Sequence, residues 1–347
     1  MKKPVKVILT IIAVVFCIGL IGTGVIFGII MYNNNKYGNA EPIMSYDVTD
    51  ISQYPTELYG IDVKHVDNGS FQGFHLIPEN KLYKGIIVCY GGSEGSPFFE
   101  VAQQYAEEGY ETLAVFMFGM KNQPKELVKV PLEQFEDVLD YINNNIEDGS
   151  PITVMAASKG AEYALNLAAR YNEISNVILL APVAYSFSGL SSGDTSSSSS
   201  WTWKDEEVPF VDIQKASGSV IFNKMIFPMI TGAPVCFKDI YNAALEADNE
   251  KDNKLIPAQN VKANILMIVG EDDQMMNTYE MAKLIQSQND NAVLHSYKNA
   301  GHIFSGDGVA IEFDMRIRLG GDIDGNRRAS EECATVINDF LSSHHGK

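Results

Sequence analysis

The stretch Ile152-Thr-Val-Met-Ala-Ala-Ser158-Lys-Gly-Ala-Glu-Tyr-Ala-Leu165 decides the fold, because an apolar strand pattern passes through one serine into a helix pattern. Its β-branched and apolar opening predicts a strand, and the Ala- and Leu-rich run over 159–171 predicts a helix. Small residues flank the serine at Ala156 and Gly160, as the tight turn called a nucleophile elbow requires. Serine at such a turn is often only a helix N-cap, so the motif needs support from other residues.

Strand and helix patterns alternate on both sides of this stretch. We expect strands at 61–66, 71–77, 85–90, 112–117, 152–157, 176–181, 265–270 and 292–297, and helices over 131–146, 159–171, 278–288 and 328–343. The first two strands flank Asp67-Asn-Gly69, which predicts a hairpin. Alternation with continuously apolar strands predicts a mostly parallel sheet with helices on both faces.

The alternation stops between about residues 185 and 260. Residues 186–200 are Ser-rich, and we expect this low-complexity segment to be a mobile loop that does not pack in the core. Trp201-Thr-Trp203 and the largely apolar stretch 220–230 follow. An insertion between late strands that carries aromatic side chains predicts a lid over a site, with an interdomain linker as the alternative.

Two further polar motifs follow later predicted strands. Glu271-Asp272-Asp273 comes directly after the strand at 265–270, and Asn299-Ala-Gly-His302 comes after the strand at 292–297. Both lie at strand carboxyl ends, where open α/β sheets bind ligands. The order Ser, Asp, His is that of a catalytic triad on such a sheet, so we expect Ser158, Asp273 and His302 to be catalytic. Asp272 competes with Asp273 for this role.

A Gly-rich loop, Gly91-Gly-Ser-Glu-Gly95, follows the strand at 85–90. The backbone N–H of Gly92 or Ser93 is a candidate oxyanion donor, together with that of Lys159 at the start of the helix. A simple tight turn is the alternative, and a phosphate-binding loop is disfavoured because no Lys-Ser/Thr pair follows. The other five histidines make no metal pattern with cysteines or acids, so we expect neither a metal nor a cofactor.

The amino-terminal segment is long and apolar. Val7 to Met31 gives 25 consecutive residues without a charge, which as a helix would span ~37 Å, enough to cross a hydrocarbon core of ~30 Å. Lys2, Lys3 and Lys6 precede it, so the positive-inside rule holds the N-terminus in the cytoplasm and sends the remainder outward. We expect a single-pass anchor in the cell membrane. A signal peptide cleaved near Gly38-Asn39-Ala40 is the alternative.

Composition and charge exclude several classes of protein. The chain has 347 residues, of which 46% are hydrophobic, and a formal net charge of −18; it is therefore neither a disordered chain nor a general nucleic-acid binder. Residues 1–40 carry +4, which leaves −22 for the rest. Among the four cysteines, Cys236 and Cys333 could pair, and two free thiols are the alternative. The sequence leaves the oligomeric state open.

At these motifs the chain resembles the acyl-CoA thioester hydrolase and bile acid-CoA:amino acid N-acyltransferase C-terminal domain family. The resemblance covers about residues 58–343 and rests on the following segments: Gly91–Gly95, Val130–Glu136, Ser158-Lys-Gly-Ala-Glu162, Trp201–Lys204, Pro209-Phe210, Gly270-Glu-Asp-Asp-Gln274, Ala300-Gly-His302 and Gly320-Gly321. It implies an α/β-hydrolase fold with a mostly parallel eight-stranded sheet. The family pattern uses the second Asp, which favours Asp273, and takes Ser or Cys as nucleophile, here Ser158.

The resemblance implies a serine hydrolase that cleaves an acyl thioester or ester of a small molecule through an acyl-enzyme. The chain departs from the family at Ala156 and Met276, and by its membrane segment and Ser-rich insertion. An external domain would meet little acyl-CoA, so an extracellular carboxylesterase or peptidase-like hydrolase is the first alternative. A catalytically silent surface-binding protein is the second.

These expectations define a domain layout. Residues 1–6 form a cytoplasmic tail, residues 7–31 the transmembrane anchor and residues 32–57 an Asn-rich tether. Residues 58–345 form the α/β-hydrolase domain, with the lid insertion at about 185–260.

Overall fold

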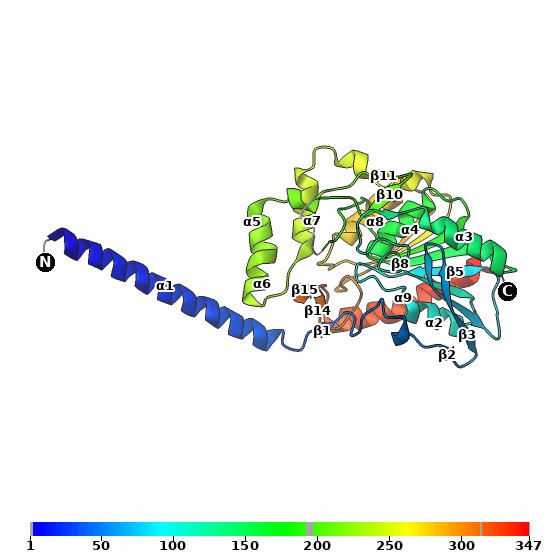
Figure 1. The fold of residues 1–347 in the computed structure, drawn as a ribbon, viewed down its shortest axis with the longest axis horizontal. Helices are drawn as coiled ribbons and strands as arrows, with labels where there is room; N and C mark the ends of the chain where they lie inside the picture. Colours follow the sequence, from blue (N-terminus) through cyan, green and yellow to red (C-terminus); the bar gives the residue numbers. More distant parts are fainter. Residues whose placement is uncertain (1–2, 192–196, 313, 347) are drawn as a thin grey trace.

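A mixed nine-stranded sheet forms the centre of the computed structural model, which describes residues 3–191, 197–312 and 314–346 (Figure 1). The strands lie in the order β13-β12-β9-β8-β5-β6-β4-β3-β2. Their bounds are β2 Glu57–Leu58, β3 Ile61–Asn68, β4 Phe71–Pro78, β5 Ile86–Tyr90, β6 Thr112–Val115, β8 Ile152–Ala157, β9 Ile174–Leu180, β12 Asn264–Gly270 and β13 Ala292–Tyr297. From β13 to β6 all neighbours are parallel, whereas β4, β3 and β2 pair antiparallel at one side.

The expected count of eight strands is therefore corrected to nine. The two residues of β2 pair antiparallel with the start of β3 and add a strand at the edge of the sheet. A pairing this short leaves no hydrophobic period in the sequence, because period-2 alternation needs four residues or more.

Helices cover both faces of the sheet, as the alternation predicted (Figure 1). One face carries α2 and α9, and the other carries α3, α4, α7 and α8. The helices span α2 Phe99–Glu107, α3 Gln134–Asn145, α4 Lys159–Ala168, α7 Phe237–Ala247, α8 Thr278–Gln288 and α9 Ile323–His344. Ile87 and Val88 of β5 are both fully buried, one in each apolar layer. Successive side chains of a strand point to opposite faces, so a continuous apolar run is needed.

The insertion between β9 and β12 packs more tightly than we expected. Ser188, Ser199 and Ser200 are buried, and the Ser200 hydroxyl donates to the Phe187 carbonyl oxygen at 3.0 Å. Trp201 is fully buried in the layer against α4. The prediction that residues 186–200 do not pack in the core is wrong for the described residues, because hydroxyls bonded to backbone groups let a Ser-rich chain enter a core. Residues 192–196 lie outside the described part of the chain.

Short elements complete the insertion and the edges. Two three-stranded sheets have the orders β1-β14-β15 and β11-β10-β7. Their strands are β1 Glu41–Pro42, β7 Val130–Pro131, β10 Trp201–Trp203, β11 Glu206–Glu207, β14 Val309–Glu312 and β15 Met315–Arg318. Within the insertion, α5 Gly218–Ile221, a π-helical turn Phe222–Ile226 and α6 Phe227–Thr231 follow one another directly. Single 3-10 turns lie at Ile51–Gln53, Ile213–Lys215, Lys251–Lys254 and Ala258–Asn260.

The amino-terminal helix α1, Lys3–Lys36, projects away from the rest of the chain (Figure 1). Its segment Thr10–Lys36 is long and apolar enough to cross a membrane, a test that a signal sequence also passes. The helix includes Asn33, Asn34 and Asn35, which we expected to lie in a tether. The following residues are held on the body: β1 pairs with β14, and Tyr54 is buried.

Candidate active site

Ser158 lies at the carboxyl end of β8, in the turn that starts α4. Its backbone has φ 54° and ψ −119°, a conformation that non-glycine residues rarely adopt and that stores strain. The close approach of α4 to the sheet explains Gly160, since a Cβ there would lie 2.0 Å from the carbonyl oxygen of Gly91. The expected nucleophile elbow is thus present as a geometry, with the side chain of Ser158 at the edge of the sheet.

His302 lies between Ser158 and Asp273. Its Nε2 is 2.9 Å from the Oγ of Ser158, and its Nδ1 is 2.7 Å from the Oδ2 of Asp273. The imidazole and the carboxylate are buried, while Ser158 is partly exposed. The structure therefore brings together the three side chains that the sequence singled out, each from the end of a different strand.

The carboxylate of Asp273 is fixed by several donors. Its Oδ1 accepts the backbone N–H groups of Met275 and Met276, at 2.8 and 2.9 Å. Its Oδ2 accepts the Thr278 hydroxyl at 2.7 Å as well as facing His302. Asp272 instead is exposed, and its carboxylate accepts from the side chain of Gln274 and the backbone N–H of Gly321. Asp273 is thus the aspartate that faces the imidazole.

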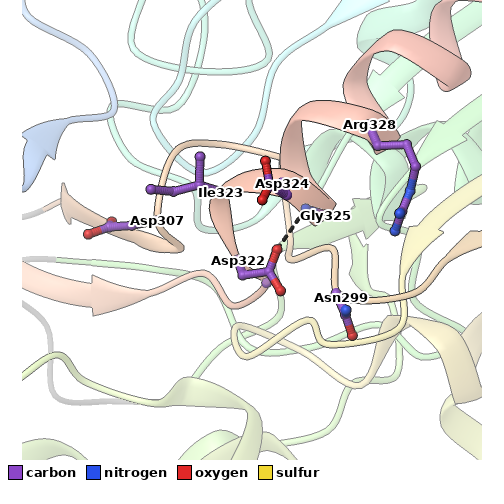
Figure 2. A pocket seen from close by; sticks show the side chains of 8 residues that line it. Asn299, Asp307, Asp322, Ile323, Asp324, Gly325 and Arg328 are labelled. Atoms are coloured by element: carbon purple, nitrogen blue, oxygen red, sulfur yellow. Dashed lines mark hydrogen bonds between the residues drawn. The ribbon is translucent and has the colours of Figure 1, made fainter.

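The loop that carries His302 is held by α9 and by the chain after β15. Asn326 of α9 accepts the N–H of Gly301 at 2.8 Å, and the N–H of His302 donates to the Leu319 carbonyl at 2.9 Å. Figure 2 shows a polar hollow beside this loop, where Asp322 caps α9 by accepting the N–H of Gly325 at 2.7 Å. The lining of that hollow includes none of Ser158, Asp273 and His302, so the hollow is separate from the candidate site.

Acidic neighbours influence the titration of His302. Burial lowers the pKa of His302, but the charge and hydrogen bond of Asp273, with smaller contributions from Glu312 and Glu94, raise it above its ordinary value. Burial and the charge of Glu94 raise the pKa of Glu312 to about 7. Ser93 links Glu312 to the Gly-rich loop, because the Ser93 hydroxyl donates to the Oε1 of Glu312 at 3.1 Å.

The candidate oxyanion donors do not have equal access to a substrate. The backbone N–H of Gly92 donates to the Oε1 of Glu94 at 2.9 Å, and the Ser96 hydroxyl donates to the same oxygen at 2.7 Å. Lys159 is the first residue of α4, where backbone N–H groups have no partner within the helix. The backbone N–H of Gly92 is thus occupied by Glu94, whereas that of Lys159 has no partner within α4.

The side chain of Lys159 forms a buried ion pair with Glu162. Its Nζ lies 2.7 Å from the Oε2 of Glu162, and both groups are buried. The other carboxylate oxygen of Glu162 accepts the indole N–H of Trp201 at 2.7 Å and the backbone N–H of Phe187 at 3.0 Å. Burial lowers the pKa of Lys159, and Glu162 partly offsets this. The Ser-Lys-Gly-Ala-Glu motif therefore joins α4 to the insertion.

A cavity of about 260 Å³ opens at Ser158 and His302. Its lining is mostly apolar and includes Phe98, Val101, Leu180, Ile268, Met275 and Leu319. Ile43 and Met44, which we expected in a tether, also line it. Such a cavity suits an apolar acyl group whose carbonyl carbon lies next to Ser158.

Some residues of the site carried no signal in the sequence. Glu94 lies inside the Gly-rich loop that we quoted, and an acid there could have been noticed. Glu312, Ile43 and Met44 lie outside every motif. Among the described residues, no group of three or more His, Cys, Asp or Glu is arranged to hold a metal ion. All four cysteines, including Cys236 and Cys333, are free thiols.

The sequence is similar to several characterised proteins. It is 23% identical over 299 residues to acyl-coenzyme A amino acid N-acyltransferase 1 of Mus musculus, covering 82% of this chain and 66% of that protein. It is 28% identical over 201 residues to acyl-coenzyme A thioesterase 6 of Homo sapiens, covering 57% and 42% respectively. The chain thus spans less than two thirds of the length of these relatives.

Solved structures share the fold. An esterase of Pyrococcus furiosus, Pf2001, superposes with a TM-score of 0.51 at 13% identity, covering 88% of this chain and 97% of that one. An acylaminoacyl peptidase of Pyrococcus horikoshii gives a TM-score of 0.54 at 15% identity, covering 84% and 43% respectively. Residues 130–346 match the family described as BAAT / Acyl-CoA thioester hydrolase C terminal. This match covers more than half of the chain, which therefore belongs to that family and has an α/β-hydrolase fold.

Proposed function

We propose that the chain is a membrane-anchored serine hydrolase that cleaves an acyl thioester or ester through Ser158, His302 and Asp273. The observation that carries the proposal is the hydrogen-bonded row of these three side chains at the mouth of an apolar cavity. Membership of a family that includes acyl-CoA thioesterases supports a thioester as the substrate.

In the acylation step Nε2 of His302 takes the proton of Ser158, whose Oγ attacks the acyl carbonyl carbon. Asp273 accepts a hydrogen bond from the Nδ1–H of His302, orients the ring and stabilises the imidazolium that forms. The negative oxygen of the tetrahedral intermediate is held by the backbone N–H groups of Lys159 and Ser93, and each such donor contributes about 3–4 kcal/mol in known cases. Collapse expels the thiol or alcohol, protonated by His302.

Release of the acyl group repeats these steps with an incoming acceptor. Water, deprotonated by His302, attacks the acyl-enzyme and gives the free acid. An amine would give an amide by the same route, as the names of the N-acyltransferase relatives suggest. The apolar lining of the cavity favours a hydrocarbon acyl group in either case.

The location follows from α1 and the charges before it. We propose that Thr10–Lys36 stays in the cell membrane as a single span, with the lysines at 2, 3 and 6 on the cytoplasmic side and the hydrolase body outside. An external body favours ester or amide substrates over acyl-CoA. Protease treatment of intact cells tests this: digestion of the body supports the external location, and protection contradicts it.

The activity is tested by thiol release from a series of acyl-CoA chain lengths, using the full chain in detergent. Thiol release that disappears in Ser158→Ala, while thermal unfolding is unchanged, would assign a thioester substrate to Ser158. If the folded protein reacts with a fluorophosphonate probe but releases no thiol, the substrate is an ester or amide. Release that persists in Ser158→Ala would contradict the proposed mechanism.

A further inference from the structure

An apolar helical arm stands out on the surface of the body. We define the arm as residues 218–231, formed by α5, the π-helical turn and α6. Large apolar side chains on it are exposed, with Phe222 at 49% and Ile230 at 60%. The others are Ile226, Phe227 and Met229. Outside the arm and α1, the exposed large apolar residues of the described chain are scattered: Ile51, Tyr59, Leu82, Val293, Ile303 and Ile323.

The exposed face of the arm is not needed for packing inside the protein. Val220, Ile221 and Met225 point the other way and pack against the core layer that contains α4 and α7. The arm is thus apolar on both sides, and one side is covered by its own body. A run of adjacent exposed apolar side chains is unfavourable in water and marks a surface that meets a partner.

The arm meets the candidate membrane span. The side chain of Asn33, near the end of α1, is buried and donates to the backbone carbonyl of Thr231 at 2.9 Å. Next to it, Arg316 bridges the side chain of Asn34 at 3.0 Å and the carbonyl of Gly232 at 2.7 Å. These bonds hold the end of α6 against the end of α1.

This contact lies at the position along α1 where the apolar stretch gives way to polar residues, which is the position expected at a bilayer surface. The apolar stretch that begins at Val7 ends at Met31, two residues before Asn33, and the next charged residue is Lys36. Tyr32, Lys36 and Tyr37 follow, with the Lys36 ammonium 5.9 and 5.0 Å from the two ring centroids. Aromatic and basic side chains of this kind gather where hydrocarbon meets headgroups. In Figure 1 the arm runs across the direction of α1 and not along it.

The low charge of the arm also fits contact with a bilayer surface. Between residues 217 and 234 the sequence contains one charged side chain, Lys224. Its ammonium is bound 2.7 Å from the carboxylate of Asp239 on α7. The outward face can therefore enter the region between headgroups and acyl chains without burying an unpaired charge.

We propose that the exposed face of the arm docks on the lipid bilayer beside α1 and lies in the plane of its surface. The proposal rests on the membrane anchoring proposed above. Docking of the arm attaches the body to the membrane at two places, α1 and the arm, so that the body cannot turn freely about the end of α1. After the arm, the backbone of Val235 bonds to Arg316 and Arg318 of β15. The backbone N–H of Lys238 donates to the carbonyl of Gln274, next to Asp273. The docked surface is thus joined, through the residues that follow it, to the loop that carries Asp273.

Photo-crosslinking in vesicles of phosphatidylcholine tests the proposal with the full chain. The crosslinking amino acid p-benzoylphenylalanine replaces Phe222 in one variant and Ile230 in another, so that one misfolded variant does not decide the result. The same amino acid in place of Ile21 is the control for insertion of α1. In place of Tyr59 it is the control for a free surface, because Tyr59 is fully exposed in the β2–β3 turn, at the end of the body away from α1 (Figure 1).

We expect lipid adducts at 21, 222 and 230, several-fold above those at 59. Lipid adducts at 21 together with only background at 222 and 230 would overturn docking of the arm and leave the anchor intact. Adducts between two copies of the chain at 222 and 230 would assign the face to a second copy and would also overturn the proposal. Background at all four positions would overturn the anchor and, with it, the docking. None of these readouts depends on hydrolase activity.

Discussion

The Nε2 atom of His302 lies 2.9 Å from the Oγ of Ser158, although 144 residues separate the two in the chain. The contact exists because both residues follow parallel strands whose carboxyl ends meet at one edge of the sheet. Ser158 follows β8 and His302 follows β13, with the strands β9 and β12 between them. Sheet topology therefore assembles the candidate site, and each of its groups gives a separate prediction.

The oxygen of Ser158 is expected to be essential. Ser158→Ala should lower turnover by about 10⁶-fold, as loss of the nucleophile does in other triads. Thermal unfolding should stay unchanged, because the hydroxyl is partly exposed and alanine keeps the Cβ in the turn. Steady-state kinetics and a melting curve on the same preparation check this, and a variant that melts earlier in proportion to its loss of activity would contradict the assignment.

Asp273 is expected to matter far more than its neighbour in the chain. Asp273→Asn should lower kcat by about 10⁴-fold, because an amide donor facing Nδ1 favours the wrong tautomer of His302. Asp272→Asn is the matched control and should keep kcat within the same order of magnitude, since Asp272 bonds only the nearby loop. Steady-state kinetics of the two variants test this expectation. Equal losses of kcat in both variants would show that the two residues act through loop structure.

The pH dependence of the activity should reflect the acidic surroundings of His302. The imidazole must be neutral to act as a base, and its pKa is raised, so kcat/KM should fall on the acid side with a midpoint above the ordinary 6.5. Removal of a negative charge favours the neutral ring. Glu312→Gln should therefore lower the pKa of His302 and move the midpoint to lower pH, whereas the exposed Glu280→Gln should not. A shift to higher pH in Glu312→Gln would contradict this account.

The buried ion pair under the insertion should stabilise the fold. Glu162→Ala leaves the ammonium of Lys159 buried without its partner and should cost about 3–5 kcal/mol of unfolding free energy. Trp201→Phe removes one hydrogen bond to Glu162 and should cost less, about 1–3 kcal/mol. The exposed pair Lys283–Glu280 provides the control Glu280→Ala, which should leave stability unchanged. Denaturant titration of the four proteins compares them, and equal stability of Glu162→Ala and Glu280→Ala would refute the role of the buried pair.

Much of this architecture was predictable because its signals are local. The strands at 152–157 and 292–297 and the helix at 278–288 have the predicted bounds, since apolar periods and turn residues mark both ends. The helix expected from 328 begins at Ile323, because Asp322 caps it and adds a turn before the apolar period starts. Ser158, Asp273 and His302 could be singled out together because each lies at or shortly after the carboxyl end of a recognisable strand.

The features that escaped prediction depend on contacts between distant segments. Trp201 was expected in a lid, but a buried acid on α4, Glu162, draws its indole N–H into the core. Ile43 and Met44 reach the cavity because β1 pairs with β14, over 260 residues later in the chain. Glu94 takes the N–H of Gly92, which the motif alone offered as an oxyanion donor. Strand pairings of two residues and side-chain hydrogen bonds leave no period in a sequence.

The central claim is that Ser158 is a nucleophile activated by His302. The most direct measurement is labelling of the full chain with a fluorophosphonate probe, followed by peptide mass spectrometry. We predict a single adduct on Ser158 that is absent in Ser158→Ala and strongly slowed in His302→Gln, with the folded protein intact in both variants. No adduct on the folded protein, or an adduct on another serine at the same rate in all three proteins, would contradict the account.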